Sequence, residues 1–416
     1  MTVWAKIALR NVAKNRRRSF YTILAIGLGY AAVNVFGGFT SYIITSLGDS
    51  YIYAQAQGHL TIFKKGFRAH AAVDPAGYLL EPAERSAVET ILAADERVLV
   101  ASPQLNLNGL LSNGDISTIF VASGRVFPDM KRMIDLAPGM LSEMDVFEGE
   151  SLEEGETYAV AVSRGLAAQL GLELGSDAVA VAPTLTGQMN ALDVEVGQLF
   201  ESAFEFLNER MMLVPLDFAQ ALYDTESVDR LTVLLSRTED AEEVSASLRE
   251  AFAEAGLDVE AVSWIELSPL YTKVRDMFDV IFLFIFVIVF IVAAMSVVNT
   301  IGMAVLERTR EIGTLRALGV KRRGIVSLFM IESALLGTMG SVLGLALTLG
   351  ARLAVAILHP TWVPPITPHR IPLVFDLVAS YALFGAVLMI ALSVAAAAPP
   401  ARRASRRGIV DALGHV

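Results

Sequence analysis

The sequence predicts an α-helical membrane protein with four transmembrane helices and a large extracytoplasmic α+β domain inserted between the first and second helices. Of the 416 residues, 54% are hydrophobic and 19% are charged, and the mean hydropathy is +0.52. The chain is therefore too apolar for an ordinary soluble protein and too charged to lie entirely in lipid. Four apolar runs each reach the roughly 20 residues that a helix needs to cross the bilayer core. A long polar stretch separates the first run from the second.

The predicted boundaries follow these apolar runs and the charged segments between them. In chain order we predict a cytoplasmic interfacial amphipathic helix at 1–19, a first span at 20–47, an external domain at 48–275, a second span at 276–306, a cytoplasmic loop with a short helix at 307–324, a third span at 325–358, a Pro-rich external loop at 359–372, a fourth span at 373–398 and a basic cytoplasmic tail at 399–416. The first segment is predicted to lie in the membrane interface because Trp4, Ile7 and Val12 share one helical face opposite Lys and Arg.

Basic residues are concentrated in the two terminal segments and in the loop at 307–324. Sixteen of the 33 Lys and Arg residues lie there beside only three acidic residues, a net charge of about +13, so the remainder carries about −24 to reach the total of −11. Short segments rich in Lys and Arg stay in the cytoplasm. We therefore predict that both termini and the loop are cytoplasmic, and that the long acidic segment lies outside the membrane.

The external segment mixes strand-like and helix-like patterns. Strands are predicted at 60–63, 116–122, 158–162, 178–181, 211–214 and 231–235. Helices are predicted at 82–94, 164–170, 216–223 and 241–255. Short connections between strands and helices of this kind predict an α+β domain with its own core.

The chain shows no catalytic or metal-binding pattern. It has no Cys, and the five His residues are too scattered for a metal motif: His59, His70, His359, His369 and His415. The pairs Glu153-Glu154 and Glu242-Glu243 lack the surroundings of acid–base catalysis. Neither a nucleotide-binding GxxxxGK[ST] loop nor a GxSxG elbow occurs. We predict a non-catalytic protein without a bound metal or cofactor.

The charged loop between the second and third spans is the most informative segment. From Glu307 to Gly324 it reads ERTREIGTLRALGVKRRG. Its apolar residues Ile312, Leu315 and Leu318 fall near helical spacing, and Gly319 can end the helix. The pattern predicts an amphipathic helix at the cytoplasmic surface, where a soluble motor can push on a membrane subunit. A positive-inside loop without any partner is a commoner source of such charge, but it rarely carries an ordered apolar stripe.

This run resembles the signature of FtsX-like permeases, the membrane subunits of the MacB, LolC-LolE and FtsX class of ABC transporters. Weaker resemblance to the lipoprotein-releasing permeases continues at 58–62, 162–175 and 264–271. The resemblance implies that the loop helix is a coupling helix that docks into a groove of an ATPase. The residues that it assigns to ATPase coupling are Glu307, Arg308, Arg310, Glu311, Ile312, Leu315, Arg316, Leu318 and Gly319.

The resemblance also implies a location in a bacterial inner membrane, with the large domain in the periplasm, and it implies the partners. Two permease subunits, identical or homologous, are expected to sit on a dimer of cytoplasmic ATPase subunits, which hold the ATP and Mg²⁺. MacB carries its ATPase domain on the same polypeptide. This chain has no nucleotide-binding GxxxxGK[ST] loop, so we expect the ATPase to be a separate subunit. Mechanotransmission then couples ATP hydrolysis to a conformational change in the periplasm. Membrane lipids are further expected partners, and nucleic acid is not expected.

For cargo, the resemblance favours a lipoprotein or lipid that is extracted from the inner membrane and passed to a periplasmic acceptor or chaperone. Apolar residues of the upper first and second spans are candidates for a cargo cavity: Phe36, Phe39, Tyr42, Ile43, Phe278, Ile281, Phe282 and Ile285. The same residues can instead face lipid or a partner helix. Two alternatives remain: MacB-like export of a periplasmic small molecule or peptide, and FtsX-like signalling to a cell-wall hydrolase.

Two features of the third span also stand out. Glu332 is an acidic residue within an apolar run, which makes a functional role worth testing. We favour pairing with a basic residue over a proton relay, because Glu332 lies only about 14 Å along the helix from Arg323. Gly340 and Gly344 form a GxxxG motif that allows close helix packing, either within one subunit or between two.

Overall fold

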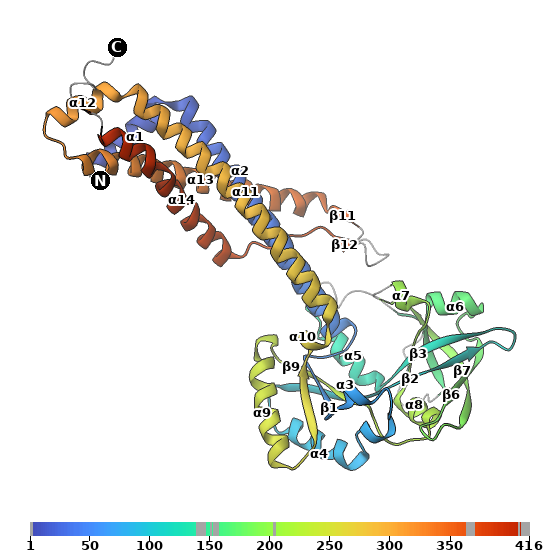
Figure 1. Cartoon of the computed structure of the whole chain (residues 1–416). Helices are drawn as coiled ribbons and strands as arrows, with labels where there is room; N and C mark the ends of the chain where they lie inside the picture. The colour runs from blue at the N-terminus through green and yellow to red at the C-terminus, as the bar shows by residue number, and fades with distance from the viewer. Residues whose placement is uncertain are drawn as a thin grey trace. The chain divides into compact units, whose positions relative to one another are not determined.

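The computed structural model describes residues 3–138, 147–149, 152, 158–202, 205–362, 371–406 and 408. They divide into a helical unit, built from both ends of the chain and residues 273–362, and an α+β unit of residues 45–272 (Figure 1). The helices of the first unit are α1 (Val3–Lys14), α2 (Arg16–Asp49), α11 (Pro269–Glu307), α12 (Thr309–Ala317), α13 (Arg322–Leu358) and α14 (Ala379–Arg406).

The described residues include four helices that are long and apolar enough to cross a membrane: α2 with its continuation to Ala54, α11, α13 and α14. The predicted fold class is thereby confirmed, although the helices extend beyond the apolar runs. α11 begins at Pro269 rather than at 276, because helix formation does not stop where hydrophobicity does.

The fourth span begins at Ala379 rather than at 373. Before it, the Asp376 backbone N–H donates to the Gly38 carbonyl at 3.1 Å, which holds this segment outside the helix. An added Cβ at Gly38 would lie 2.0 Å from the Asp376 carbonyl oxygen, so the close approach requires glycine. The Pro-rich loop is described only at its ends, where β11 (Thr361–Trp362) pairs with β12 (Ile371–Pro372). Residues 363–370 lie outside the described residues, as do most of those after Arg406.

The α+β unit is built around one mixed sheet, which has ten strands among the described residues. These are β1 (Leu60–Lys64), β2 (Val98–Ser112), β3 (Ser117–Arg125), β4 (Phe147–Gly149), β5 (Ala159–Ser163), β6 (Asp177–Pro183), β7 (Met189–Phe200), β8 (Met211–Pro215), β9 (Arg230–Leu235) and β10 (Val259–Ser263). The order is β10-β1-β9-β2-β3-β8-β5-β7-β4, with β6 pairing to β2 and β7. Only the β3–β8 and β5–β7 pairs are parallel among these.

The strand β2 joins the two halves of this sheet. Its first half pairs with β9, and its second half pairs with β3 and β6. The helices of the unit are α3 (Phe67–His70), α4 (Pro82–Ala93), α5 (Phe127–Asp135), α6 (Arg164–Leu170), α7 (Glu205–Asn208), α8 (Leu216–Tyr223), α9 (Ala241–Glu254) and α10 (Trp264–Leu267). Because β2 contributes to both halves, they share one hydrophobic core rather than two.

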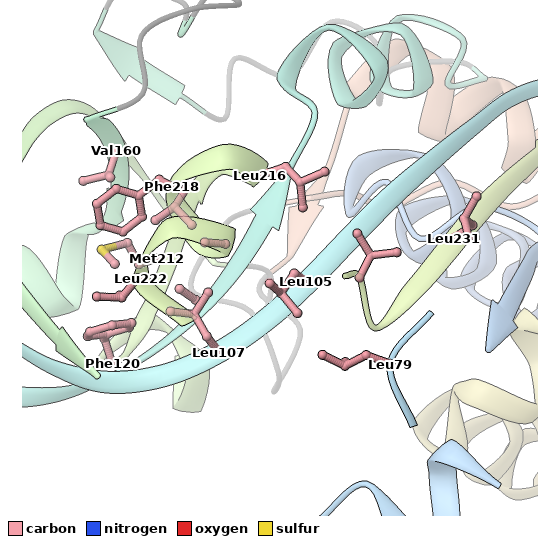
Figure 2. Packing of buried hydrophobic residues seen from close by; sticks show 14 of the residues in the cluster. Leu79, Leu105, Leu107, Phe120, Val160, Met212, Leu216, Phe218, Leu222 and Leu231 are labelled. Atoms are coloured by element: carbon pink, nitrogen blue, oxygen red, sulfur yellow. The ribbon is translucent and has the colours of Figure 1, made fainter. Parts of the chain in front are cut away.

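Figure 2 shows the part of this core where α8 packs on the sheet. Phe218 and Leu222 of α8 point toward Phe120 of β3 and Met212 of β8, and all four are fully buried. The burial of each such side chain stabilises the fold by roughly 1.5–3 kcal/mol before entropy is counted. The α+β unit therefore has a core of its own.

The six strands that the pattern predicts are present. The strands β2, β4, β7 and β10 and the helices α3, α5, α7 and α10 are not among the sequence predictions. β2 contains Pro103 and Gly109, which ordinarily argue against a strand interior. Gly109 is needed there because a Cβ would lie 2.2 Å from the Val181 carbonyl oxygen of β6. The close contact between β2 and β6 explains why glycine occupies position 109, and a linear sequence pattern does not show this contact.

Candidate functional site

The candidate site is α12 together with the helix ends around it. A single residue, Arg308, separates α12 from α11, and its backbone angles (φ −111°, ψ 19°) break the helix. α12 ends where Gly319 takes φ +94° and the Val320 N–H donates to the Leu315 carbonyl at 3.1 Å. In Figure 1, α12 lies at the same end of the helical unit as α1. The loop therefore holds a discrete short helix that begins at a defined break.

One face of α12 packs inside its own chain. Ile312 is 6% exposed and belongs to a cluster with Val305 at the end of α11 and Ile325 of α13. Leu315 packs against the same cluster. The apolar stripe predicted from the sequence is thus present, but much of it holds α12 against the other helices of this subunit.

The opposite face of α12 and the two residues that directly follow the helix are exposed. Leu318 is 78% exposed, and Arg310, Glu311 and Gly319 also face outward. Arg316 differs, because its guanidinium donates to the Ser405 carbonyl of α14 at 2.6 Å. Of the nine residues assigned to coupling, Arg310 and Glu311 on α12 and Leu318 and Gly319 directly after it form the outward-facing surface that a partner can reach, and Glu307 is exposed at the end of α11.

Arg308 points into the helical unit. Its Nη1 donates to Glu332 Oε1 of α13 at 2.8 Å, and its Nε donates to Glu311 Oε2 at 2.9 Å. Burial opposes the charge of the guanidinium, but Glu332 and Glu311 outweigh it and raise the pKa of Arg308. The side chain of Arg308 is only 12% exposed. The residue is therefore engaged within the chain rather than presented to a partner.

The same cluster includes the interfacial helix α1. The Asn11 side-chain amide donates to Glu332 Oε1, and Lys14 lies 3.9 Å from Glu311. Nearby, Arg18 at the start of α2 donates twice to Glu307 at the end of α11, at 2.6 and 3.1 Å. The ends of five helices thus meet at one polar cluster, which the sequence gives no means to assemble because its members are up to 321 positions apart.

Four of the eight candidate cargo residues form an aromatic cluster between α2 and α11. The Phe36 ring lies 6.3 Å from that of Phe278 and 6.4 Å from that of Phe282. Phe39 lies 6.3 Å from Phe278 and 5.9 Å from Trp362. Tyr42, Ile43 and Ile285 are half-buried, whereas Ile281 is exposed. These ring contacts hold α2 against α11. The assignment of the eight residues to a cargo cavity stays a prediction.

The GxxxG motif of α13 faces α2 of the same chain. A Cβ at Gly340 would lie 2.5 Å from Ile26 Cγ2, and one at Gly344 would lie 2.6 Å from the Gly27 carbonyl oxygen. Absence of these side chains allows the two backbones to approach. Of the two packing modes open to the motif, the structure contains the one within a subunit.

The link from α2 into the α+β unit holds two buried charged or titratable residues that the sequence did not single out for a role. Arg125 is 4% exposed and donates to the Ala56 carbonyl at 2.8 Å, just after the helix ends. Burial lowers the pKa of Arg125 to about 10. His59 is fully buried, and burial lowers its pKa to about 4. Both residues fix the chain where the first span enters the sheet.

Within the described part of the chain, no group of three or more His, Asp or Glu residues is placed to hold a metal ion. His59 and His70 each contact an aromatic ring instead: Tyr53 and Tyr78 respectively. Glu242 and Glu243 are exposed on α9, where Glu243 pairs with Arg97 at 3.0 Å. His369, His415 and the Glu153-Glu154 pair lie outside the described residues.

Two family models match the chain. The MacB-like periplasmic core domain matches residues 19–251, more than half of the sequence, and the FtsX-like permease C-terminal model matches residues 283–409. An ABC transporter permease of Methanocaldococcus jannaschii is 25% identical over 352 residues, which cover 82% of this chain and 81% of the relative.

Other relatives match over shorter regions. The lipoprotein-releasing system transmembrane protein LolC of Neisseria meningitidis is 26% identical over 256 residues, 59% of each chain. The macrolide export ATP-binding/permease protein MacB 1 of Yersinia pestis is 33% identical over 128 residues, 30% of this chain and 18% of the relative. The chain thus spans less than two thirds of these two relatives. The periplasmic region of MacB from Actinobacillus actinomycetemcomitans aligns with a TM-score of 0.37 at 13% identity, covering 53% of this chain and 92% of that one.

The family matches cover both the external domain and the later spans, in the order in which the structure places them. The Methanocaldococcus jannaschii relative is described as an ABC transporter permease, the Yersinia pestis relative as an ATP-binding/permease protein and the Neisseria meningitidis relative as a transmembrane protein. The chain therefore belongs to the family of membrane-spanning ABC transporter permeases that combine a MacB-like periplasmic core domain with an FtsX-like permease C-terminal region.

Proposed function

We propose that this permease is the non-catalytic subunit of a transporter whose separate ATPase docks on the exposed face of α12. The observation that carries the proposal is the division of α12 into two faces. Its buried face is fixed to α11 and α13 through Ile312, whereas Arg310, Glu311 and Leu318 remain uncovered. A helix that is anchored on one side and open on the other can transmit force from a bound partner to the spans.

The spans themselves suit this task. α11 continues without Gly or Pro from Phe278 to Thr300, which keeps it stiff. α2 and α11 both connect the helical unit to the α+β unit along the chain. We propose that ATP and Mg²⁺ bound in the ATPase dimer drive its closure, which moves α12 and, through α2 and α11, the external domain. Both termini and α12 then lie in the cytoplasm, in agreement with the basic residues there.

For cargo, we propose a lipoprotein or another lipid-bearing molecule taken from the inner membrane and delivered to a periplasmic acceptor, with two permease subunits in the complex. The LolC relative of Neisseria meningitidis supports this assignment, since its name describes lipoprotein release. The MacB relative of Yersinia pestis supports the alternative, export of a small molecule or peptide. FtsX-like signalling to a cell-wall hydrolase is the remaining candidate.

The docking proposal is tested with Leu318→Asp. A charge in the middle of an apolar contact weakens an interface by several kcal/mol, so we expect co-purification of the ATPase and stimulation of its activity to be lost. Leu174→Asp, a change of a 42% exposed leucine in the α+β unit, is the matched control and should have no effect. Retention of the ATPase by the Leu318→Asp variant would contradict the assignment of α12.

The cargo proposal is tested by native mass spectrometry of the complex purified from its own membranes. We expect an ATPase dimer, two permease subunits and a bound acylated protein or lipid. An ATPase together with an adaptor protein and no lipid-bearing cargo would support export instead, and an associated hydrolase would support signalling.

A further inference from the structure

Glu332 is an acidic side chain buried in a helix that we treat as a membrane span. It is 4% exposed, and an unpaired carboxylate at such a place would cost several kcal/mol. The structure supplies two donors, Arg308 Nη1 at 2.8 Å and the Asn11 amide, and both bind Oε1. A cavity of about 20 Å³ beside Glu332 is lined by both polar and apolar residues, with Asn15, Ser19 and Thr300 among the polar ones, and it has room for one water molecule.

Arg308, the first of the two donors to Glu332, lies at the break between α11 and α12. The Arg308 guanidinium has a fork of donors in one plane, which allows it to bind Glu332 of α13 and Glu311 of α12 at the same time. It also lies over the ring of Phe329, with 5.9 Å from Cζ to the centroid. Because the backbone at Arg308 is not helical, these contacts fix the direction in which α12 leaves α11.

The other ion pairs of the cluster are weaker. Lys14 and Glu311 are 77% and 55% exposed at 3.9 Å, and Arg18 and Glu307 are 30% and 47% exposed. Exposed pairs of this kind contribute about 0–1 kcal/mol because water screens them. The pair of Arg308 with Glu332 is buried on both sides, at 12% and 5% exposure, so its loss would leave Arg308 with the 55% exposed Glu311 and Glu332 with the uncharged Asn11 amide.

We propose that Glu332 is a positioning residue: by holding Arg308 it locks the coupling helix α12 to α13 and α1, so that force on α12 moves the membrane helices instead of bending the α11–α12 break. The inference rests on the proposed function, in which an ATPase acts on α12. It replaces the expectation that Glu332 is paired for stability alone, because its partner is the residue that sets the orientation of α12.

The test uses the absence of Cys from the chain. A spin label on Thr314→Cys, an exposed position of α12, reports the mobility of this helix by electron paramagnetic resonance. In the complete complex, Glu332→Gln keeps the shape of the side chain but loses its charge. We expect the ATPase to remain bound, the label to become more mobile and the stimulated ATPase activity to fall about tenfold, a typical size of coupling between sites. Arg308→Lys, which keeps the charge but not the fork, should behave in the same way.

Lys14→Gln removes the exposed pair with Glu311 and is the control, for which wild-type mobility and stimulation are expected. Wild-type values in Glu332→Gln would overturn the proposal. If Glu332→Gln does not accumulate, the double change Glu332→Gln with Arg308→Gln also removes the buried positive charge of Arg308, which would otherwise keep only the half-exposed Glu311 of its two carboxylate partners. A mobile label in that variant would support the proposal, and a wild-type spectrum with full stimulation would overturn it. If the wild-type chain binds no ATPase, the proposed function fails, whereas the spin-label comparison still decides whether Glu332 positions α12.

Discussion

The imidazole of His59 connects the start of β1 to the end of β9. The Leu235 backbone N–H donates to His59 Nδ1 at 3.0 Å, so the proton of the neutral ring is on Nε2, which lies 3.0 Å from Thr238 Oγ1. A second proton on Nδ1 would break the bond to Leu235 and leave a buried charge. The lowered pKa of about 4 therefore follows from the position of His59 rather than from its neighbours in sequence.

This residue predicts a pH dependence of stability. The pKa of His59 is about 4 in the folded protein and 6.5 for an ordinary histidine, so the unfolded chain binds the extra proton between these values. The contribution of His59 to the free energy of unfolding is complete above about pH 6.5 and declines as the pH falls toward 4. Between pH 7.5 and pH 5 we expect the free energy of unfolding to fall by about 2 kcal/mol because of His59.

Thermal unfolding of the α+β unit within the full chain, followed at both pH values, measures this effect. His59→Asn, whose amide oxygen can replace Nδ1 as acceptor, removes the titrating group and is the comparison. The difference in pH dependence between the two proteins isolates His59 from other titrating residues. Identical pH dependence in both would refute the assignment.

At the scale of elements, the contact between α2 and α13 depends on the absence of side chains. A Cβ at Gly344 would lie 2.6 Å from the Gly27 carbonyl oxygen and equally close to the ring of Tyr30, so neither the backbone nor the ring leaves room for it. Tyr30 is itself fixed, because its hydroxyl donates to the Ala382 carbonyl of α14 at 2.6 Å. Three spans are thus held together around one glycine.

We expect Gly344→Ala to destabilise the helical unit by about 1–3 kcal/mol, as overpacking does in other tightly packed cores. Gly350→Ala is the matched control, since a Cβ at Gly350 meets nothing within 4 Å and alanine favours the helix. The midpoint of thermal unfolding in detergent should fall for the first variant and stay level or rise for the second. Equal midpoints would mean that the helices can separate without cost.

At the scale of the whole molecule, the orientation in the membrane connects charge to function. The proposal requires α12 to face the cytoplasm and the α+β unit to lie outside. Because the natural chain has no Cys, single cysteines can report the compartment of each part. Suitable exposed positions are Leu318 in the loop after α12 and Glu254 on α9.

In intact cells whose outer membrane has been made permeable, a charged maleimide should label Glu254→Cys and leave Leu318→Cys unlabelled. Both should react after the inner membrane is disrupted, which controls for buried thiols. Labelling of Leu318→Cys in intact cells would reverse the topology, and with it the assignment of the ATPase site to α12.

The sequence by itself determined the fold class, the four spans and the family. Each depends on signals that are local or additive: apolar runs of span length, alternation of apolar residues and the motif at 307–324. Local patterns also located six of the ten strands found among the described residues of the α+β unit, but not β2 or β7, whose Gly109 and Gly197 leave room for close neighbours that a linear pattern does not show.

Only the tertiary structure decided how the residues of the candidate site are used. The sequence grouped Arg308, Ile312 and Leu318 as one coupling surface, yet Arg308 and Ile312 face their own subunit and Leu318 faces out. It also marked Glu332 without identifying a partner. The physical reason is that burial and ion pairing depend on contacts between helices hundreds of residues apart, and a linear sequence sets the chemistry of each residue without setting which residues meet.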